Sequence, residues 1–191
     1  NKLLLTVGSS TSPANLYLYN IESKALKQLT STLNPEVDRN DLVQAEVVRF
    51  KSFDGLEIPA IYYKPLQADK KNKVGALIFV HGGPGGQSRV GFSKDIQYCV
   101  NHGYAVLAVN NRGSSGYGKS FYKMDNRDHS NGDLKDCIYG KKWLASQDYI
   151  DSTAIGIVGG SYGGCMVLGA LAFHPDEFKV GVDLYGVANW L

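Results

Sequence analysis

The stretch IGIVGGSYGGCMVLGALA, residues 155–172, places a single serine, Ser161, between two pairs of glycines. The apolar run at 154–158 predicts a buried strand, and Tyr162–Phe173 predicts a helix. Because glycine loses more conformational freedom on folding than any other residue, four of them around one hydroxyl indicate a tight backbone bend. The pentapeptide Gly159-Gly160-Ser161-Tyr162-Gly163 fits the G-x-S-x-G nucleophile elbow, which predicts Ser161 as a nucleophile. The alternative is an ordinary serine in a glycine-rich turn.

The chain around this stretch alternates strands with helices. Continuous apolar runs predict buried strands at Val74–Val80, at 104–110 and at 178–185. Helical periodicity predicts helices at 93–102 and 133–146. Such alternation is typical of a parallel sheet with helices packed on it, so the predicted fold class is α/β.

The N-terminal part has a different pattern. Residues 1–30 alternate apolar and polar side chains between turn signals and predict three short antiparallel strands. Three strands alone are marginally stable, so we expect them to complete a sheet formed elsewhere. Residues 31–44 look like a linker. Two strand-like runs follow, joined at Asp54-Gly55, which is a two-residue hairpin signal.

A second motif, His81-Gly82-Gly83-Pro84, follows the predicted strand Val74–Val80. Acyl transfer needs two N–H donors for the tetrahedral oxyanion. In elbow-bearing sheets one donor belongs to the residue after the serine, here Tyr162, and the other to a loop of the HGG type. The alternative for His81 is a histidine that ends a strand for structural reasons.

A third motif is similar to a phosphate-binding loop. Residues 113–120, GSSGYGKS, fit the phosphate-binding P-loop pattern and follow a predicted strand. That mechanism requires a helix opening at Lys119, but the residues after it have no apolar stripe and contain the breaker Asn131-Gly132. We therefore expect a glycine-rich loop here and keep nucleotide binding as a distant alternative.

The composition excludes several classes of partner. The net charge is +2 with dispersed Lys and Arg, so neither nucleic acid nor an anionic membrane is an expected partner. No apolar run approaches the ~20 residues of a membrane helix.

Cys99, Cys137 and Cys165 have neither disulfide nor zinc spacing, and no metal or organic cofactor is expected. We expect a cytoplasmic location. Because the chain does not begin with methionine, a periplasmic or secreted location stays open.

A nucleophilic serine needs a base that is itself oriented by an acid. In α/β-hydrolases the chain order is serine, acid, histidine. After Ser161 the only histidine is His174, which precedes every acid there and lies at the end of the predicted helix. We therefore expect the chain to be a fragment. Its expected partner is a missing C-terminal segment of the same protein, which would hold the acid and the base; a homo-oligomer is a further option.

The chain contains five motifs in this order: HGGPGG, NNRGSSGYGKSF, GDLKDCIYGKKWL, GGSYGG and GVANWL. Together they resemble the prolyl oligopeptidase family of serine peptidases, most closely its acylaminoacyl-peptidase-like branch. The resemblance implies a doubly wound, mostly parallel α/β-hydrolase sheet, of which 45–191 would be the N-terminal part. Residues 1–44 would be the last strands of a β-propeller and a linker.

The resemblance also implies roles for individual residues. Ser161 would be the nucleophile that forms an acyl-enzyme with short peptides. Tyr162 and Gly83, with Gly82 beside it, would form the oxyanion hole, and Tyr162 and Trp190 would border the substrate pocket. A carboxylesterase on the same fold is the nearest alternative.

Overall fold

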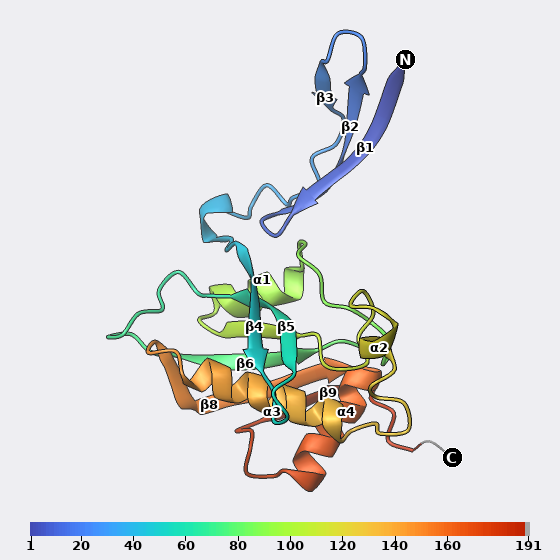
Figure 1. Cartoon of the computed structure of the whole chain (residues 1–191). Coiled ribbons are helices and arrows are strands. Elements are labelled where there is room, and N and C mark those ends of the chain that lie inside the picture. The colour runs from blue at the N-terminus through green and yellow to red at the C-terminus, as the bar shows by residue number, and fades with distance from the viewer. Residues whose placement is uncertain (190–191) are drawn as a thin grey trace.

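Two separate β-sheets, joined by residues 29–44, are the main features of the computed structural model, which describes residues 1–189 (Figure 1). The small sheet is antiparallel with the order β1-β2-β3, and the large sheet has the order β4-β5-β7-β6-β8-β9. The strands are β1 (Lys2–Ser9), β2 (Ser12–Asn20), β3 (Leu26–Gln28), β4 (Ala45–Lys51), β5 (Glu57–Tyr63), β6 (Val74–Val80), β7 (Ala105–Val109), β8 (Ile150–Gly160) and β9 (Gly181–Leu184). The helices are η1 (Arg39–Asp41), α1 (Lys94–Asn101), α2 (Lys119–Tyr122), α3 (Gly132–Ala145) and α4 (Tyr162–Phe173).

The large sheet is parallel where the candidate site lies. Strands β7, β6, β8 and β9 run in the same direction. At one side of the sheet, β5 runs in the opposite direction and pairs antiparallel with both β7 and β4. Val80 at the end of β6 pairs with Gly159 near the end of β8. Because the carboxyl ends of parallel strands meet at one edge of the sheet, the loop after β6 and the turn after β8 are neighbours.

Helices cover both faces of this sheet, as in a doubly wound fold. Side chains of β6 alternate between the two faces: Ile78 belongs to the core cluster that includes residues of α3 and α4, and Phe79 packs against the cluster that includes residues of α1. The mixed α/β class predicted from the sequence is confirmed. The predicted helices at 93–102 and 133–146 appear as α1 and α3, each within one residue of the expected start.

Two local predictions were wrong. The hairpin between β4 and β5 has a three-residue loop, because Ser52 N–H pairs with Leu56 O and Gly55 adopts φ +84° inside it. A helix does begin at Lys119, where no helix was expected, but α2 is only four residues long. Its single turn needs no apolar stripe, which is why periodicity did not reveal it.

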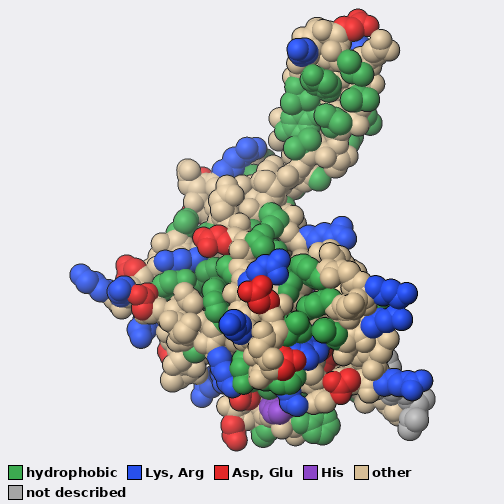
Figure 2. All heavy atoms as spheres, in the orientation of Figure 1, with side chains coloured by type: hydrophobic (Ala, Val, Ile, Leu, Met, Phe, Trp, Pro, Cys, Tyr) green, Lys and Arg blue, Asp and Glu red, His purple; other side chains and the backbone are tan. Residues whose placement is uncertain are grey.

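The small sheet presents apolar side chains to solvent. Figure 2 shows them gathered on the projecting part of the molecule, where Leu4 is 63% and Leu26 57% exposed. Three strands cannot enclose a core of their own, which is the physical reason for this exposure. None of the helices within residues 1–189 combines the length and the apolar character that a membrane-spanning helix needs.

Candidate active site

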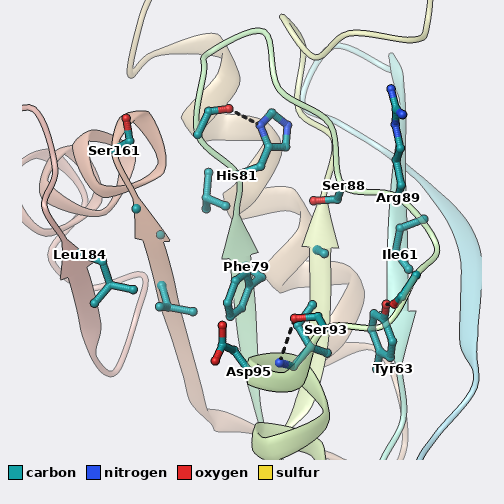
Figure 3. Close-up of a pocket in the computed structure, with 18 of the residues that line it drawn as sticks. Ile61, Tyr63, Phe79, His81, Ser88, Arg89, Ser93, Asp95, Ser161 and Leu184 are labelled. Atoms are coloured by element: carbon teal, nitrogen blue, oxygen red, sulfur yellow. Dashed lines mark hydrogen bonds between the residues drawn. The ribbon is translucent and has the colours of Figure 1, made fainter. Parts of the chain in front are cut away.

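Ser161 stands exposed at the turn between β8 and α4, at the carboxyl edge of the sheet (Figure 3). Its backbone has φ +56° and ψ −119°, a conformation that a residue with a side chain rarely adopts outside strained functional turns. A Cβ on Gly163 would collide with Val80 O, and one on Gly159 would lie 2.5 Å from the carbonyl carbon of Gly163. The predicted reason for these glycines, close approach of strand and helix backbones, is confirmed.

Backbone hydrogen bonds hold the turn from both sides. Ser161 N–H donates to Leu184 O at the end of β9, at 3.0 Å. The Ser161 carbonyl accepts from Cys165 N–H at 3.1 Å, which starts the hydrogen-bond ladder of α4. The orientation of the serine therefore depends on the docking of β9 as well as on β8 and α4.

The loop after β6 lies directly beside this serine. A Cβ placed on Gly82 would be 3.9 Å from Ser161 Oγ. Gly83 has φ +140°, and a Cβ there would lie 2.5 Å from Gly85 N, so a side chain has no room. The structure thus brings Gly82 and Gly83 to the candidate nucleophile, as the motif predicts. Their role as oxyanion donors, with Tyr162 N–H as the other donor, stays a prediction.

His81 is part of the same loop. Its Nδ1 lies 2.9 Å from Gly82 O, and its Nε2 lies 2.8 Å from Ser114 Oγ in the loop after β7. Burial disfavours the charged ring and lowers the pKa of His81 below its usual range. At neutral pH the ring is therefore neutral and both of its nitrogens have partners.

A pocket of about 490 Å³ opens beside Ser161, on the face of the sheet that carries α1 (Figure 3). His81, Gly82 and Ser161 are among the residues that line it, and its wall is largely apolar, with Phe79 and Leu184 also lining it. An apolar pocket beside an exposed hydroxyl is a common form of ligand site.

The side chain of Tyr162 is buried and makes contacts that were not predicted from the sequence. Its side chain is 2% exposed and is not among the residues lining that pocket. The hydroxyl donates to Asp133 Oδ2 in the first turn of α3 and lies 3.1 Å from His129 Nδ1. Burial raises the pKa of Asp133 and of Tyr162, and the charge of the Asp133 carboxylate raises the pKa of Tyr162 further. The prediction that Tyr162 borders the substrate pocket therefore stays a prediction, and Trp190 lies outside the described residues.

Within residues 1–189 no acid and base complete a triad with Ser161. Two of the four histidines, His102 and His174, are the C-terminal caps of α1 and α4, as expected. His81 and His129 have the partners given above, and no described side chain hydrogen-bonds Ser161 Oγ. The same described residues contain no group of three acidic, histidine or cysteine side chains placed to hold a metal ion.

The P-loop-like segment 113–120 packs against the loop after β6. Ser115 N–H donates to Gly86 O at 2.9 Å, and Ser114 contacts His81 as described. A helix of four residues after Gly118 offers no extended N-terminus for phosphate. The geometry supports the glycine-rich-loop interpretation of this motif.

Comparison with known proteins agrees with these observations. A profile of the prolyl oligopeptidase family matches residues 90–191, more than half of the chain. Among curated proteins, dipeptidyl aminopeptidase BIII of Pseudoxanthomonas mexicana is 32% identical across 97% of this chain, and dipeptidyl peptidase family member 6 of Caenorhabditis elegans is 31% identical across 97%. The chain spans only 28% of the length of each.

Solved structures give the same result for the fold. An acylaminoacyl peptidase of Pyrococcus horikoshii superimposes with a TM-score of 0.82 at 31% identity, covering 100% of this chain and 30% of that protein. A puromycin-hydrolysing peptidase of Mycobacterium tuberculosis superimposes with a TM-score of 0.89, covering 98% of this chain and 30% of that protein. At 24% identity the latter likeness shows the fold alone.

Proposed function

The chain belongs to the prolyl oligopeptidase family, and on that premise we propose that it carries the nucleophile of a serine peptidase acting on short peptides. The observation that supports this most directly is Ser161, exposed at a strained strand-to-helix turn with Gly82 beside it. The names of the relatives, dipeptidyl aminopeptidase and acylaminoacyl peptidase among them, favour short peptide substrates.

The proposed reaction has two acyl-transfer steps. Ser161 Oγ attacks the peptide carbonyl carbon while a base takes the hydroxyl proton. The N–H groups of Tyr162 and Gly83 stabilise the resulting oxyanion, the C–N bond breaks, and the amine leaves with the proton. Water then adds to the ester carbon of the acyl-enzyme, which releases the acid and restores the serine.

We place the acid and the base of this reaction in a later segment of the same protein. Two facts support this: the chain spans 28–30% of its relatives, and none of its described histidines reaches Ser161 Oγ. Residues 1–191 alone should therefore show no Ser161-dependent turnover, since losing the base costs subtilisin about as much as losing the whole triad.

We also assign residues 1–44 to the end of a β-propeller and a linker, and 45–191 to the start of the peptidase domain. The exposed leucines of β1 and β3 support this assignment, because a propeller blade packs its faces against neighbouring blades.

The test uses the full-length protein and its Ser161→Ala variant. A fluorophosphonate should label the wild type covalently and leave the variant unlabelled, and the variant should also lose turnover of a peptide anilide. Label or turnover that persists in the Ser161→Ala variant would contradict the proposal. Ester turnover with no anilide turnover would identify a carboxylesterase instead.

A further inference from the structure

An exposed stretch of chain connects the small sheet to the large one. Residues 34–41 are all exposed, and they form local backbone bonds: Val37 N–H donates to Asn34 O, and Asp41 N–H donates to Asp38 O. Two folded parts joined by such a segment are expected to move relative to one another unless a large apolar interface holds them. A fixed orientation of the projecting small sheet, as in Figure 1, therefore needs a second attachment.

The two ends of this stretch belong to different sheets. At its start, Thr32 N–H donates to Asn15 Oδ1 on β2 at 2.9 Å, which holds the chain to the small sheet. After its end, Val43 is buried in the same apolar cluster as Tyr63 of β5 and Ile96 of α1. The freedom of the joint therefore lies between Thr32 and Val43.

The side chain of Gln97, in α1, bridges the two parts. Its Nε2 donates to Ser10 O, in the turn between β1 and β2, at 2.8 Å and to Val43 O at 2.9 Å. Its Oε1 accepts from Val43 N–H at 3.0 Å, and the residue is only 4% exposed. Both N–H groups and the oxygen of this amide therefore have partners, on the small sheet and on the chain that enters the large one.

Ser10 is buried although it lies at the tip of a hairpin. Connecting turns usually lie in solvent, but Ser10 is only 2% exposed. Its Oγ accepts from the N–H of Ala45, the first residue of β4, at 3.1 Å. The turn is thus bound twice, by its carbonyl to α1 and by its hydroxyl to β4. These bonds join the two sheets directly, without passing through residues 34–41.

Two pockets adjoin this cluster of hydrogen bonds. One of about 310 Å³ lies between the linker and α1, and Gln97 itself lines it. Another of about 350 Å³ is lined by Ser9 and Ser12, on either side of the turn, and by Phe92 just before α1. Because the packing around the joint is open at these two places, its rigidity depends on the buried hydrogen bonds.

We propose that Gln97 is a clamp between the two sheets, whose amide holds the Ser10 turn and the chain at Val43 on α1 and so fixes the orientation of the small sheet. Opening the clamp leaves buried donors and acceptors without partners, which opposes the motion. The next residue of α1 toward its start, Ile96, lines the pocket beside Ser161. The small sheet and this wall of the pocket therefore keep one relative position while the clamp is closed. The clamp does not depend on the proposed peptidase function.

The test is amide-resolved hydrogen exchange in the full-length protein and its Gln97→Met variant. Methionine has a similar length but lacks the amide that donates and accepts. Val43 N–H loses its acceptor and should exchange ~10- to 100-fold faster, as expected when buried hydrogen bonds are not made. Ala45 N–H should also exchange faster, because its acceptor, Ser10 Oγ, leaves with the released turn. The amides of β6 should exchange at the wild-type rate.

Gln147→Met is the matched control. Gln147 is half-buried just after α3, and its Nε2 donates to Trp143 O in that helix at 3.1 Å. Its replacement should leave the exchange of Val43 and Ala45 unchanged. If Gln97→Met fails to fold, Gln97→Asn, whose amide is one carbon closer to the backbone, should give the same pattern of faster exchange.

Three results would overturn the proposal. The first is wild-type exchange at both Val43 and Ala45 in Gln97→Met. The second is faster exchange at Val43 with Ala45 unchanged, which would mean that Gln97 orders the linker without holding the small sheet. The third is an equal acceleration in β6, which would mean that Gln97 supports the large sheet as a whole.

Discussion

The hydroxyl of Tyr162 donates a hydrogen bond to the carboxylate of Asp133, which ties the residue after the candidate nucleophile to the first turn of α3. Asp133 is fully buried, and its other oxygen accepts from Asn131 N–H at 3.0 Å and Leu134 N–H at 2.8 Å. One carboxylate therefore organises both the start of α3 and the side chain that begins α4. Variants of the full-length protein test this and the other contacts of the site.

Tyr162→Phe should lower the free energy of unfolding by ~1.5–3 kcal/mol, because a buried carboxylate loses a hydrogen-bond donor. Urea denaturation would measure the change. Tyr98→Phe is the control, since Tyr98 on α1 is 66% exposed, and it should have no measurable effect. Equal stability of Tyr162→Phe and wild type would contradict the importance of this bond.

Asp133 also predicts a pH dependence of stability. Burial raises the pKa of Asp133, so the folded state binds a proton more readily than the unfolded state. Protonated Asp133 therefore contributes to the free energy of unfolding. This contribution is complete below the usual aspartate pKa of about 3.9 and is lost as the pH rises through the higher pKa that Asp133 has in the folded state. Relative to Asp133→Asn, the wild type should lose stability as the pH rises above about 3.9. A difference between the two proteins that stays constant with pH would refute the shift.

Arg112 joins the β4–β5 hairpin to α3 through two carboxylates of unequal exposure. It donates to Asp136 at 2.9 and 3.0 Å and to Asp54 at 3.0 and 3.1 Å. The Asp136 side chain is 0% exposed, whereas that of Asp54 is 40% exposed.

Asp136→Asn should therefore cost ~3–5 kcal/mol of stability, as expected for breaking a buried pair. Asp54→Asn should cost only ~0–1 kcal/mol, because solvent screens the exposed pair. Guanidinium denaturation of both variants gives the comparison. Equal losses would show that burial does not decide the strength of these bonds.

Gly83→Val should lower kcat by ~10²–10³-fold, which is the effect of losing one oxyanion donor. The reason is geometric, since valine disfavours φ +140° and its Cβ would lie 2.5 Å from Gly85 N. Val47→Ala is the control, because Val47 on β4 is 65% exposed and does not line the pocket beside Ser161. Steady-state anilide hydrolysis would measure both. An unchanged kcat in Gly83→Val would remove this peptide from the mechanism.

The features that could be predicted from the sequence are those determined by residues close together in the chain or by the general geometry of parallel sheets. The glycines around Ser161 predict the elbow because strand, turn and helix are consecutive in the chain. The proximity of the HGG loop could also be predicted, since parallel strands end at a common edge. The bond between Tyr162 and Asp133 could not, because it depends on how α3 and α4 pack. The helix α2 was missed because four residues are too few to show a periodic apolar stripe. The loop at Gly55 is one residue longer than predicted, because the Asp54-Gly55 signal does not show where the pairing of the two strands ends.

The hydrogen bond from Ser161 N–H to Leu184 O also has a consequence for synthesis on the ribosome. Leu184 comes later in the chain than Ser161, so the elbow cannot take its final geometry while β9 is still inside the exit tunnel. At about 5–20 residues per second, this delay is on the order of a second or more. During that time β8 lacks a partner on one side, and the serine lacks the contact that orients it. In a nascent chain the turn at Ser161 should therefore reach its final geometry only after β9 has emerged and paired.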